Sequence, residues 1–411
     1  MSNKKFSIVI PTFNHLEECL KPCIESIIKF TDLSETELII VANGCTDGTN
    51  DYINELIARE NFDIYLYWFD EPLGYTKATN IGIEASCGEF VILLNNDTIL
   101  LDQEKNQWID MLFKPFSNES TAITGPMKAF CPFAQSDFLI FFCVMIRKKM
   151  FDLLGLLDEC FNPGFGEDTD FSIKCINAGY NIVQIPEETR NYQDDANKKM
   201  VGNFPIYHAG EKTFNNLEKI ESFNTDGDKL IKKNRMILAK RYGKGKAKLN
   251  LGCGNRPIQG YINIDICDSA ADFMMDAKKL DFEDNFAYEI KAIHLFEHFS
   301  PYEIYGILGE WKRVLRPGGS LILEMPNILE LCNHFHEQNS GGKYHLLNCI
   351  FGTYDPNIAK ETPHKYGWCP DILYEHLDRS GFVEIKQAEL EFTHHWGYNF
   401  RMECKKTIKL I

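Results

Sequence analysis

Short apolar runs alternate with amphipathic segments along the first half of the chain. We expect four strands there, at Phe6–Ile10, Glu37–Ala42, Ile64–Phe69 and Phe90–Leu94. Between the strands, apolar residues recur at helical spacing in three segments, His15–Phe30, Thr49–Arg59 and Thr76–Ala85. This alternation predicts a mostly parallel sheet with helices on both faces, and hence an α/β fold.

A second alternating series begins in the second half of the chain. Its strands are expected at Lys248–Leu251, Tyr261–Asp265, Ala292–Leu295 and Ser320–Met325. Between the two series, the lysine-rich segment Asn216–Arg241 has helical spacing and is followed by the Gly-Lys-Gly-Lys stretch Gly243–Lys246. We therefore expect a first domain at 1–215, a helical linker at 216–245 and a second α/β domain at 246–411.

Composition limits the class of protein further. The chain has 411 residues, enough for two or three domains, and its formal net charge of -16 argues against non-specific binding to nucleic acid. Its 14 cysteines include no Cys-x-x-Cys pair, which indicates reduced thiols in a cytoplasmic protein. Pro11 ends the first apolar run too early for a signal peptide, and no run approaches the ~20 apolar residues of a membrane span. We expect no integral membrane segment and no nucleic-acid partner.

Polar residues directly follow several of the expected strands. The strand ends read Pro11-Thr12-Phe13-Asn14, Asn43-Gly44 and Asn95-Asn96-Asp97. Asn and Asp are favoured in turns, so one polar end carries little information. In an open α/β sheet, however, ligands bind beyond the carboxyl ends of the strands. Several polar ends at one edge therefore favour a binding site, to which Asp97 would bring an acidic group.

Five motifs of the first half resemble family 2 glycosyltransferases of the GT-A fold. They are SIVIPTFN, VANGCTDGT, LGYTKATNIGIEASCGEF, LLNND and FGEDTDFSIKCINAGY, and the resemblance covers roughly residues 5–215. It implies a nucleotide-sugar-binding domain and a divalent cation, Mn²⁺ or Mg²⁺, that bridges the diphosphate of the donor. Such a cation with oxygen ligands neutralises the charge that builds on a leaving diphosphate.

The resemblance also assigns residues to this site. Asp97 is expected to bind the metal and His208, in PIYHAGEKTF, to complete its shell, although a lone histidine is more often structural. The donor is expected to lie against six further residues, Pro11, Thr12, Asn14, Asn43, Asn95 and Asn96. The family usually has an acidic residue where Ala42 stands and Ser where Cys45 stands, so the nucleotide is less well defined than the metal. Asn43 can accept a hydrogen bond from a uracil N–H, and we expect a UDP-sugar.

Glu167 and Asp168 lie in the Gly-rich turn PGFGEDTDF before an expected helix. Capping and the helix dipole favour acidic residues at a helix N-terminus, which would explain one of the two. By resemblance, Asp168 is the general base that takes the proton of the acceptor hydroxyl, and Glu167 contacts the acceptor. Upstream, the apolar run FLIFFCVMI between Asp137 and Arg147 is expected to form one core strand facing the acceptor region.

In the second half, LNLGCGNRP places Gly252 and Gly254 directly after an expected strand, and YINIDI carries Asp265 near its end. Glycine allows a backbone to approach a ligand closely, and the carboxylate of Asp265 can grip a ribose diol. Asp265 follows Gly254 by eleven residues rather than the ~20 of a dinucleotide fingerprint, which counts against a dehydrogenase.

Five motifs of this half resemble class I S-adenosylmethionine-dependent methyltransferases. They are LNLGCG, GYINIDI, MDAKKLDF, IHLFEHF and RVLRPGGSLILEMPN, and the resemblance covers about residues 246–390. It implies a Rossmann-like domain in which Gly252, Gly254 and Asp265 hold S-adenosylmethionine. By the same resemblance, Asp276 would lie near the adenine amine and His294 would line the pocket.

Glu297 and His298 follow the strand after which such enzymes usually present their substrate. His298 is a candidate base, although a capping or core histidine is the alternative, and many methyltransferases act mainly through proximity and orientation. The end of the chain is rich in histidine, at His334, His336, His364, His394 and His395. No spacing repeats among them, so we do not expect a metal there.

These observations predict a bifunctional enzyme. Its first half would transfer a sugar, with inversion, from a UDP-sugar to a hydroxyl of a surface glycan or of a flagellin-like protein, and its second half would then methylate the product. In the alternative, the second half is a non-catalytic module that docks the acceptor or a partner. A nucleotidyltransferase is disfavoured, because PTFNHLEEC offers no basic residue for phosphate before Lys21.

Overall fold

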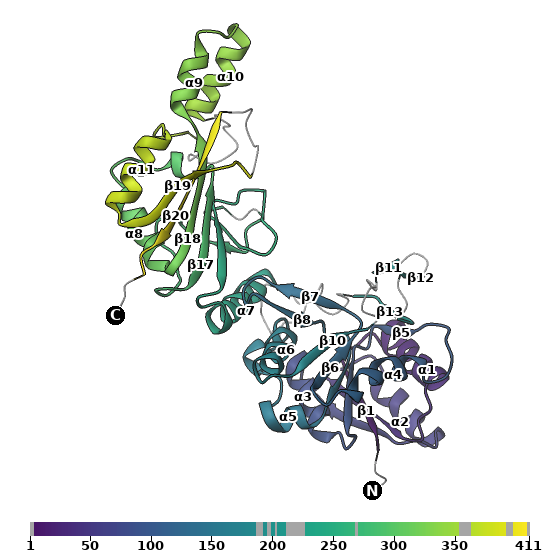
Figure 1. Ribbon diagram of the computed structural model, residues 1–411. Coiled ribbons are helices and arrows are strands. Elements are labelled where there is room, and N and C mark those ends of the chain that lie inside the picture. The colour runs from purple at the N-terminus through teal and green to yellow at the C-terminus, as the bar shows by residue number, and fades with distance from the viewer. Residues whose placement is uncertain are drawn as a thin grey trace. The chain divides into compact units, whose positions relative to one another are not determined.

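The computed structural model describes residues 4–185, 192–194, 199–201, 204–210, 227–267, 270–352, 363–391 and 398–408 (Figure 1). The chain divides into two compact units. Unit 1 comprises 1–131 and 136–235, and unit 2 comprises 132–135 and 236–411. The division falls within helix α7 (Gly227–Tyr242), inside the segment expected as a linker. Residues 216–226 of that segment lie outside the described residues, so the linker itself stays a prediction.

Unit 1 is built on a seven-stranded sheet of order β10-β6-β9-β4-β1-β2-β3. Its strands are β1 (Phe6–Thr12), β2 (Thr36–Asn43), β3 (Ile64–Phe69), β4 (Phe90–Leu94), β6 (Thr121–Gly125), β9 (Cys143–Arg147) and β10 (Asn181–Gln184). Strands β1 to β4 are parallel to their neighbours among themselves, whereas β9 runs antiparallel to both β4 and β6. The predicted mostly parallel sheet is confirmed, and β3 and β4 have the predicted bounds.

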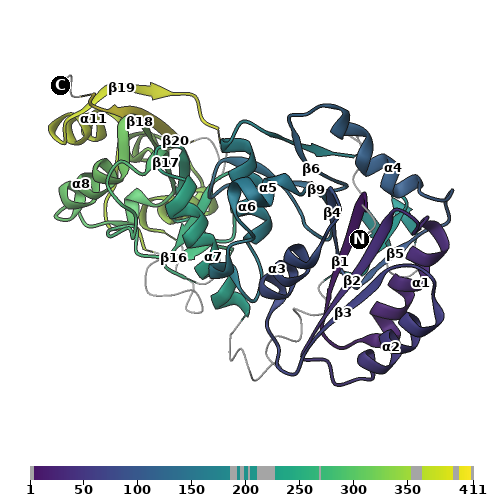
Figure 2. The ribbon, with the colours of Figure 1, turned by 90° about the horizontal axis from the view of Figure 1, so that it is seen from below.

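Helices cover both faces of this sheet (Figure 2). One face carries α1 (Lys21–Phe30), α2 (Thr49–Arg59) and α4 (Gln107–Phe113), and the other carries α3 (Tyr75–Ala85), α5 (Lys149–Leu154) and α6 (Glu167–Asn177). Along β1, Ile8 and Ile10 join the core of the first face while Val9 joins the core of the second. Strands buried on both sides read as continuous apolar runs, which explains the sequence pattern.

Shorter elements complete unit 1. They are the π-helical turn η1 (Leu16–Leu20), the 3-10 turns η2 (Lys114–Ser117) and η3 (Glu159–Phe161), and the two-stranded pairs β5 (Thr98–Leu100) with β13 (Ile206–His208), β7 (Lys128–Cys131) with β8 (Ser136–Leu139), and β11 (Tyr192–Asp194) with β12 (Lys199–Val201). The π-helical turn opens the predicted helix His15–Phe30, whose α-helical part is thus only α1.

The expectation of one core strand for FLIFFCVMI was wrong. The run is divided between β8, which ends at Leu139, and β9, which begins at Cys143. Because β8 pairs with β7 and β9 pairs with β4 and β6, the chain must pass from one sheet to another between them. Two backbone hydrogen bonds hold the link between these strands. Ile140 N donates to Met127 O at 3.0 Å, and Asn95 N donates to Phe142 O at 2.8 Å.

Unit 2 contains a second seven-stranded sheet, of order β16-β15-β14-β17-β18-β20-β19. Its strands are β14 (Ala247–Leu251), β15 (Ile262–Asp265), β16 (Phe273–Met274), β17 (Ala287–Ile293), β18 (Leu315–Pro326), β19 (Phe382–Ala388) and β20 (Asn399–Lys406). The strands from β16 to β18 are parallel, and β20 is antiparallel to both of its neighbours. The fold is therefore α/β in both units, as predicted.

The strand expected at Ala292–Leu295 is β17, which begins and ends earlier than predicted. The part of β17 that precedes Ala292 contains the charged residues Glu289 and Lys291, which hid it from the apolar pattern. Lys291 is buried and pairs with Glu391 at 2.8 Å, so its charge is balanced within the fold.

Besides the end of α7, the described part of unit 2 contains four α-helices and one short turn. They are α8 (Ile304–Val314), α9 (Ile328–Phe335), α10 (Ser340–Phe351), α11 (Pro370–Arg379) and the 3-10 turn η5 (Phe296–His298). Leu331, Leu346 and Cys349 form a small separate core between α9 and α10. Across the described residues of both units, no helix combines the length and the hydrophobicity needed to cross a membrane.

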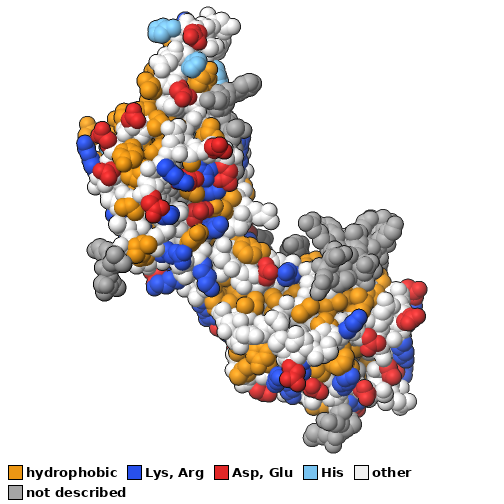
Figure 3. Space-filling view, in the orientation of Figure 1, with side chains coloured by type: hydrophobic (Ala, Val, Ile, Leu, Met, Phe, Trp, Pro, Cys, Tyr) orange, Lys and Arg blue, Asp and Glu red, His pale blue; other side chains and the backbone are white. Residues whose placement is uncertain are grey.

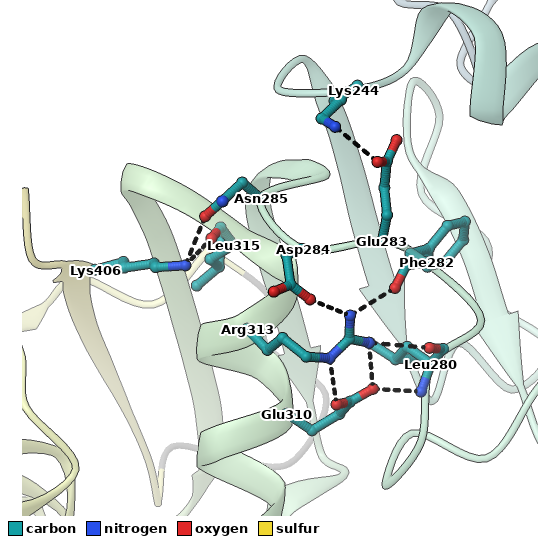
Figure 4. A network of polar contacts seen from close by, with 10 residues as sticks. All are labelled: Lys244, Leu280, Phe282, Glu283, Asp284, Asn285, Glu310, Arg313, Leu315 and Lys406. Atoms are coloured by element: carbon teal, nitrogen blue, oxygen red, sulfur yellow. Dashed lines mark hydrogen bonds and ion pairs between the residues drawn. The ribbon is translucent and has the colours of Figure 1, made fainter.

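Arg313 of the RVLRPGG motif ties α8 to the segment before β17 (Figure 4). Its guanidinium pairs with Glu310 through two bonds of 2.8 Å and donates to Phe282 O at 2.8 Å and to Asp284 at 2.9 Å. Glu310 in turn accepts from the backbone N–H of Leu280 at 2.8 Å. A planar fork of donors suits this arrangement, so the arginine of the motif has a structural role here.

Two helical glycines offer a matched test of packing. A Cβ at Gly82 on α3 would lie 2.2 Å from Val9 Cγ1, whereas a Cβ at Gly306 on α8 meets no described heavy atom within 4 Å. We expect Gly82→Ala to lower the free energy of unfolding of unit 1 by about 1–3 kcal/mol. Gly306→Ala should raise that of unit 2 by about 0.5–1 kcal/mol, because it stiffens the unfolded chain without a clash. Denaturant titration followed by circular dichroism measures both, and an unchanged Gly82→Ala protein would contradict the close packing of α3 on β1.

Candidate active sites

The order of strands in unit 1 reverses between β1 and β4. The chain proceeds outward from β1 through β2 to β3 and then returns to the other side of β1 for β4. Ligands in open α/β sheets bind outside the carboxyl ends of the strands at such a reversal. Thr12 ends β1 there, and Asn96 follows β4. Asn96 Nδ2 donates to Thr12 Oγ1 at 2.9 Å, so the structure brings these two predicted residues together.

Asp97 and His208 also meet at this edge. The short strands β5 and β13 pair antiparallel, with His208 opposite Thr98, and His208 Nε2 lies 3.2 Å from Asp97 Oδ1. The imidazole stacks on the ring of Phe142, with centroids 4.4 Å apart and planes inclined by 8°. The two residues predicted to bind the metal, which are distant in the sequence, are thus held side by side.

The polar atoms of this corner fit a divalent cation. Asp97 Oδ1 and Asn95 Oδ1 are both buried, and neither makes a hydrogen bond within the described residues. Buried oxygen atoms without a donor are costly, particularly on a carboxylate. Carboxylate and amide oxygens with one imidazole are ligands that suit Mn²⁺ and also Mg²⁺. A cation here would supply the positive charge that the described chain does not.

Asn43 is committed to backbone contacts. Its Nδ2 donates to Thr12 O at 2.7 Å, and its Oδ1 accepts from Leu73 N at 3.2 Å and from Gly74 N at 3.3 Å. Both lone pairs of the amide oxygen are therefore in use, and the oxygen has no further capacity for a base N–H. In this arrangement Asn43 could contact a nucleobase only as a donor, through the remaining N–H of its amide.

Asn14 and Cys45 tie the end of β1 to the loop after β2. Asn14 N donates to Cys45 Sγ at 3.3 Å, and Asn14 Oδ1 accepts from Thr46 N at 2.7 Å. Cys45 Sγ donates to Thr12 O at 3.5 Å, and burial raises the pKa of this thiol. The thiol thus fills the place where the family usually has Ser. Pro11, within β1 beside these residues, is buried and paired with Val41 across the sheet.

Glu167 and Asp168 open α6 after Gly166, whose φ of 112° lies in the region that favours glycine. Burial raises the pKa of Asp168 to about 6, and burial together with the Asp168 charge raises that of Glu167 further above its usual range. Asp168 Oδ1 accepts from Thr169 N at 2.6 Å, whereas Glu167 Oε2 makes no hydrogen bond within the described residues. A carboxylate with a pKa near neutrality is suited to accept a proton.

Tyr75 lies between these two groups of acids, and sequence analysis did not single it out. Its hydroxyl donates to Phe141 O at 3.0 Å. Burial raises its pKa, and the charges of Glu167, Asp168 and Asp97 act in the same direction. The neighbouring carbonyl of Phe142 accepts from Asn95 N, so the link between β8 and β9 contacts both groups. LGYTKATN carried the only local signal for Tyr75, through the family resemblance.

Unit 2 has a comparable reversal between β14 and β17. The chain runs outward from β14 through β15 to β16 and returns to the other side of β14 for β17. A cavity of about 470 Å³ lies at the carboxyl ends of these strands, lined among others by Asn250, Gly252, Arg256, Ile293 and His294. Its size and position suit a nucleoside cofactor.

The glycines of this cavity are required by local geometry. Gly252 has a φ of 68°, and a Cβ there would lie 2.8 Å from Leu295 Cδ1. Gly254 N donates to Asp265 Oδ2 at 2.8 Å. Asp265 therefore holds the loop after β14, although neither it nor Asp276 is among the residues that line the cavity. Asp276 accepts from Lys278 N at 2.9 Å, and its contact with an adenine stays a prediction.

His294 and His298 lie close together at the end of β17. His294 lines the cavity, and its Nδ1 lies 3.2 Å from Glu297 Oε1. His298 packs edge-on against His364, with ring centroids 4.9 Å apart. The role of His298 as a base stays a prediction. His364 joins this group although it comes from the His-rich end of the chain, whereas His394 and His395 lie outside the described residues.

Comparison with known families assigns one family to each unit. Residues 7–132 match the family described as glycosyl transferase family 2, and residues 249–323 match the family described as methyltransferase domain. The first match covers four of the five glycosyltransferase motifs, whereas the motif with Glu167 and Asp168 lies beyond its end, as does His208. The second match covers the methyltransferase motifs up to residue 323.

Three relatives with established names match only part of the chain. Glycosyltransferase AglE of Haloferax volcanii is 29% identical over 121 residues, which are 29% of this chain and 38% of the relative. Glycosyltransferase GlyG of Streptococcus pneumoniae is 28% identical, over 26% of this chain and 34% of the relative. The O-antigen biosynthesis protein RfbC of Myxococcus xanthus is 21% identical, over 47% of this chain and 18% of the relative. The chain thus spans well under half the length of each.

Solved structures with some similarity include two glycosyltransferases. Mannosyltransferase PcManGT of Pyrobaculum calidifontis, in complex with GDP-Man and Mn²⁺, has a TM-score of 0.37 and 16% identity, over 44% of this chain and 55% of that one. GalNAc-T7 with UDP, GalNAc and Mn²⁺ has a TM-score of 0.39 and 17% identity, over 44% of this chain and 42% of that one.

The family matches and the two α/β sheets agree with one another. The chain therefore joins a glycosyltransferase family 2 domain, matched over residues 7–132, to a methyltransferase domain, matched over residues 249–323.

Proposed function

We propose that unit 1 transfers a sugar, with inversion, from a nucleotide-sugar to an acceptor hydroxyl in a metal-dependent reaction, and that unit 2 then methylates the product. The observation that carries the first part is the pairing of Asp97 with His208, whose side chains lie 3.2 Å apart. The second part rests on the cavity beside Gly252 and His294.

The proposed transfer is a single displacement. The acceptor oxygen attacks the anomeric carbon, the bond from that carbon to the diphosphate oxygen breaks, and the hydroxyl proton passes to Asp168. The raised pKa of Asp168 makes it a stronger base than an exposed aspartate while leaving it ionised above about pH 6. Asp97, His208 and Asn95 would hold the cation, which neutralises charge on the departing diphosphate.

We also propose a donor and an acceptor for this reaction. UDP is the nucleotide we propose, with Asn43 as an N–H donor to the base and Pro11, Thr12, Asn14 and Asn96 around it. The name of the Myxococcus relative supports a surface glycan as acceptor, and a flagellin-like protein is the second candidate. Screening nucleotide-sugars for metal-dependent hydrolysis and thermal stabilisation identifies the donor.

In unit 2, S-adenosylmethionine would supply the methyl group. The loop that carries Gly252 and Gly254, fixed by the Gly254 to Asp265 hydrogen bond of 2.8 Å, would lie against it, as would His294. Asp265 and Asp276 are proposed for its ribose and adenine, and His298 as base. The alternative is a non-catalytic module, and calorimetry with S-adenosylmethionine discriminates, because a module without the cofactor site would release no heat.

Asp97→Ala should abolish most of the manganese-dependent affinity for nucleotide-sugar. Because Asp97 is buried, we add Asp97→Asn, which keeps the shape of the side chain. This variant should also lose at least tenfold in affinity for nucleotide-sugar, since an amide binds the cation less strongly than a carboxylate. Calorimetry with and without Mn²⁺ measures both, with the exposed Asp102→Ala as control. Full affinity in the Asp97 variants would remove this residue from the metal site.

Transfer should depend on pH through Asp168. Its pKa is raised to about 6, so the base form is lost as pH falls through that value, and kcat/KM for the acceptor should fall with it. Asp168→Asn should bind donor normally and lose about 10²–10⁴-fold in transfer rate at every pH. The exposed Asp152→Asn is the matched control. An unchanged rate in Asp168→Asn would move the role to Glu167 or elsewhere.

We expect glycosyl transfer in unit 1 to precede methylation in unit 2. A fused pair of active units gains from a high local concentration of the first product near the second site. We expect S-adenosylhomocysteine to be released only when donor, metal and acceptor are all present. Asp168→Asn should silence this release, and acceptor glycosylated beforehand should restore it. Methylation of a free nucleotide-sugar without acceptor would reverse the order.

A further inference from the structure

Three side chains of unit 2 converge beside the cofactor cavity, and one of them is His298, the candidate base. Glu297 and His298 come from η5, directly after β17, and His364 comes from the segment before α11. One potential ligand atom from each lies within 4.8 Å of the other two. Backbone hydrogen bonds fix the segment that carries His364, from Lys365 N to Glu297 O at 2.8 Å and from His364 N to Phe351 O at 2.9 Å.

The carboxylate of Glu297 is enclosed and incompletely satisfied. Glu297 is 2% exposed, and its Oε2 makes no hydrogen bond within the described residues. Its Oε1 lies 3.2 Å from His294 Nδ1 and 3.9 Å from His364 Nε2. His298 Nδ1 is buried and likewise makes no hydrogen bond in that part of the chain. A buried carboxylate oxygen without a donor is costly, so this oxygen calls for a further positive partner.

The other described histidines from the His-rich end of the chain lie elsewhere. His334 Nδ1 is 2.9 Å from Glu330 O on α9, and His336 is exposed. Figure 3 shows histidine side chains at the surface of the part of unit 2 that α9 and α10 form. The prediction that these histidines do not form a metal site together compared them only with one another. His364 has its partners in the earlier motif IHLFEHF.

We propose that Glu297, His298 and His364 bind a divalent transition metal beside the cofactor cavity of unit 2. Two imidazoles and one carboxylate suit Zn²⁺, Mn²⁺ or Co²⁺ better than Ca²⁺, which prefers a shell of oxygens. His294 is a positioning residue: it contacts Glu297 Oε1 and also lines the cavity, so it links the metal site to the cofactor site.

Three protein ligands leave coordination positions for oxygen atoms of water or of a substrate. Two neighbouring hydroxyls of a sugar would match such positions, and this assignment of the substrate class rests on the proposed function. The metal site itself does not, because it depends only on the three side chains and their geometry. It is also distinct from the site at Asp97 and His208, which belongs to the other unit.

Binding of Co²⁺ to the full-length chain tests the proposal. All variants are made in a parent protein that carries Asp97→Asn and His208→Ala, because these two substitutions remove the proposed metal ligands of unit 1. We expect this parent to bind one equivalent of Co²⁺ with visible absorption bands. Adding Glu297→Gln or His364→Ala should weaken the binding at least tenfold and remove the bands, whereas adding His336→Ala should leave both unchanged.

Binding of S-adenosylmethionine, measured by calorimetry, accompanies each variant. If the Glu297→Gln and His364→Ala proteins still bind the cofactor, they are folded. Their loss of Co²⁺ binding then reports on the metal site. If His364→Ala does not fold, Glu297→Gln and His298→Gln decide. A parent that binds no Co²⁺, or folded variants that bind it as tightly as the parent, would overturn the proposal. None of these outcomes depends on glycosyl transfer or methylation.

Discussion

Buried carboxylate oxygens without hydrogen-bond donors are the constraint on which both candidate sites depend. Asp97 Oδ1 and Glu297 Oε2 are each enclosed just beyond a parallel strand, and within the described residues neither accepts a hydrogen bond. Each has an imidazole nearby, from His208 in one unit and from His294 in the other. Burial of charge in this way costs stability, which is normal where function rather than packing determines the residue.

Burial acts on carboxylates in both units, and their neighbours decide the result. Burial raises the pKa of Asp168 to about 6, where a base can exchange a proton. At Glu297 burial acts in the same direction, but the hydrogen bond from His294 and the charges of the neighbouring histidines bring the pKa below its usual value. A carboxylate can therefore be suited either to accept a proton or to stay an anion, depending on its surroundings.

The sequence predicted the features that residues close together in the chain determine. Apolar runs on β1, β2 and β4 predicted these strands, because both of their faces are buried, whereas Glu289 and Lys291 hid the part of β17 before Ala292. The pairing of Asp97 with His208 could be expected only from family resemblance, since no spacing connects them. Tyr75 and His364 were missed as site residues for the same reason: their partners are brought to them by tertiary contacts, such as the one between Lys365 N and Glu297 O.

The positions of His208 and His364 in the chain have a consequence for folding, should the two proposed metal sites hold ions. His208 comes after every strand of the main sheet of unit 1, and His364 after the last parallel strand of unit 2. An ion bound at such a site would join segments that are distant in the sequence, and because it would bind only the folded chain it would stabilise that state. The concentration of metal would then determine how firmly β13 and the segment before α11 are held.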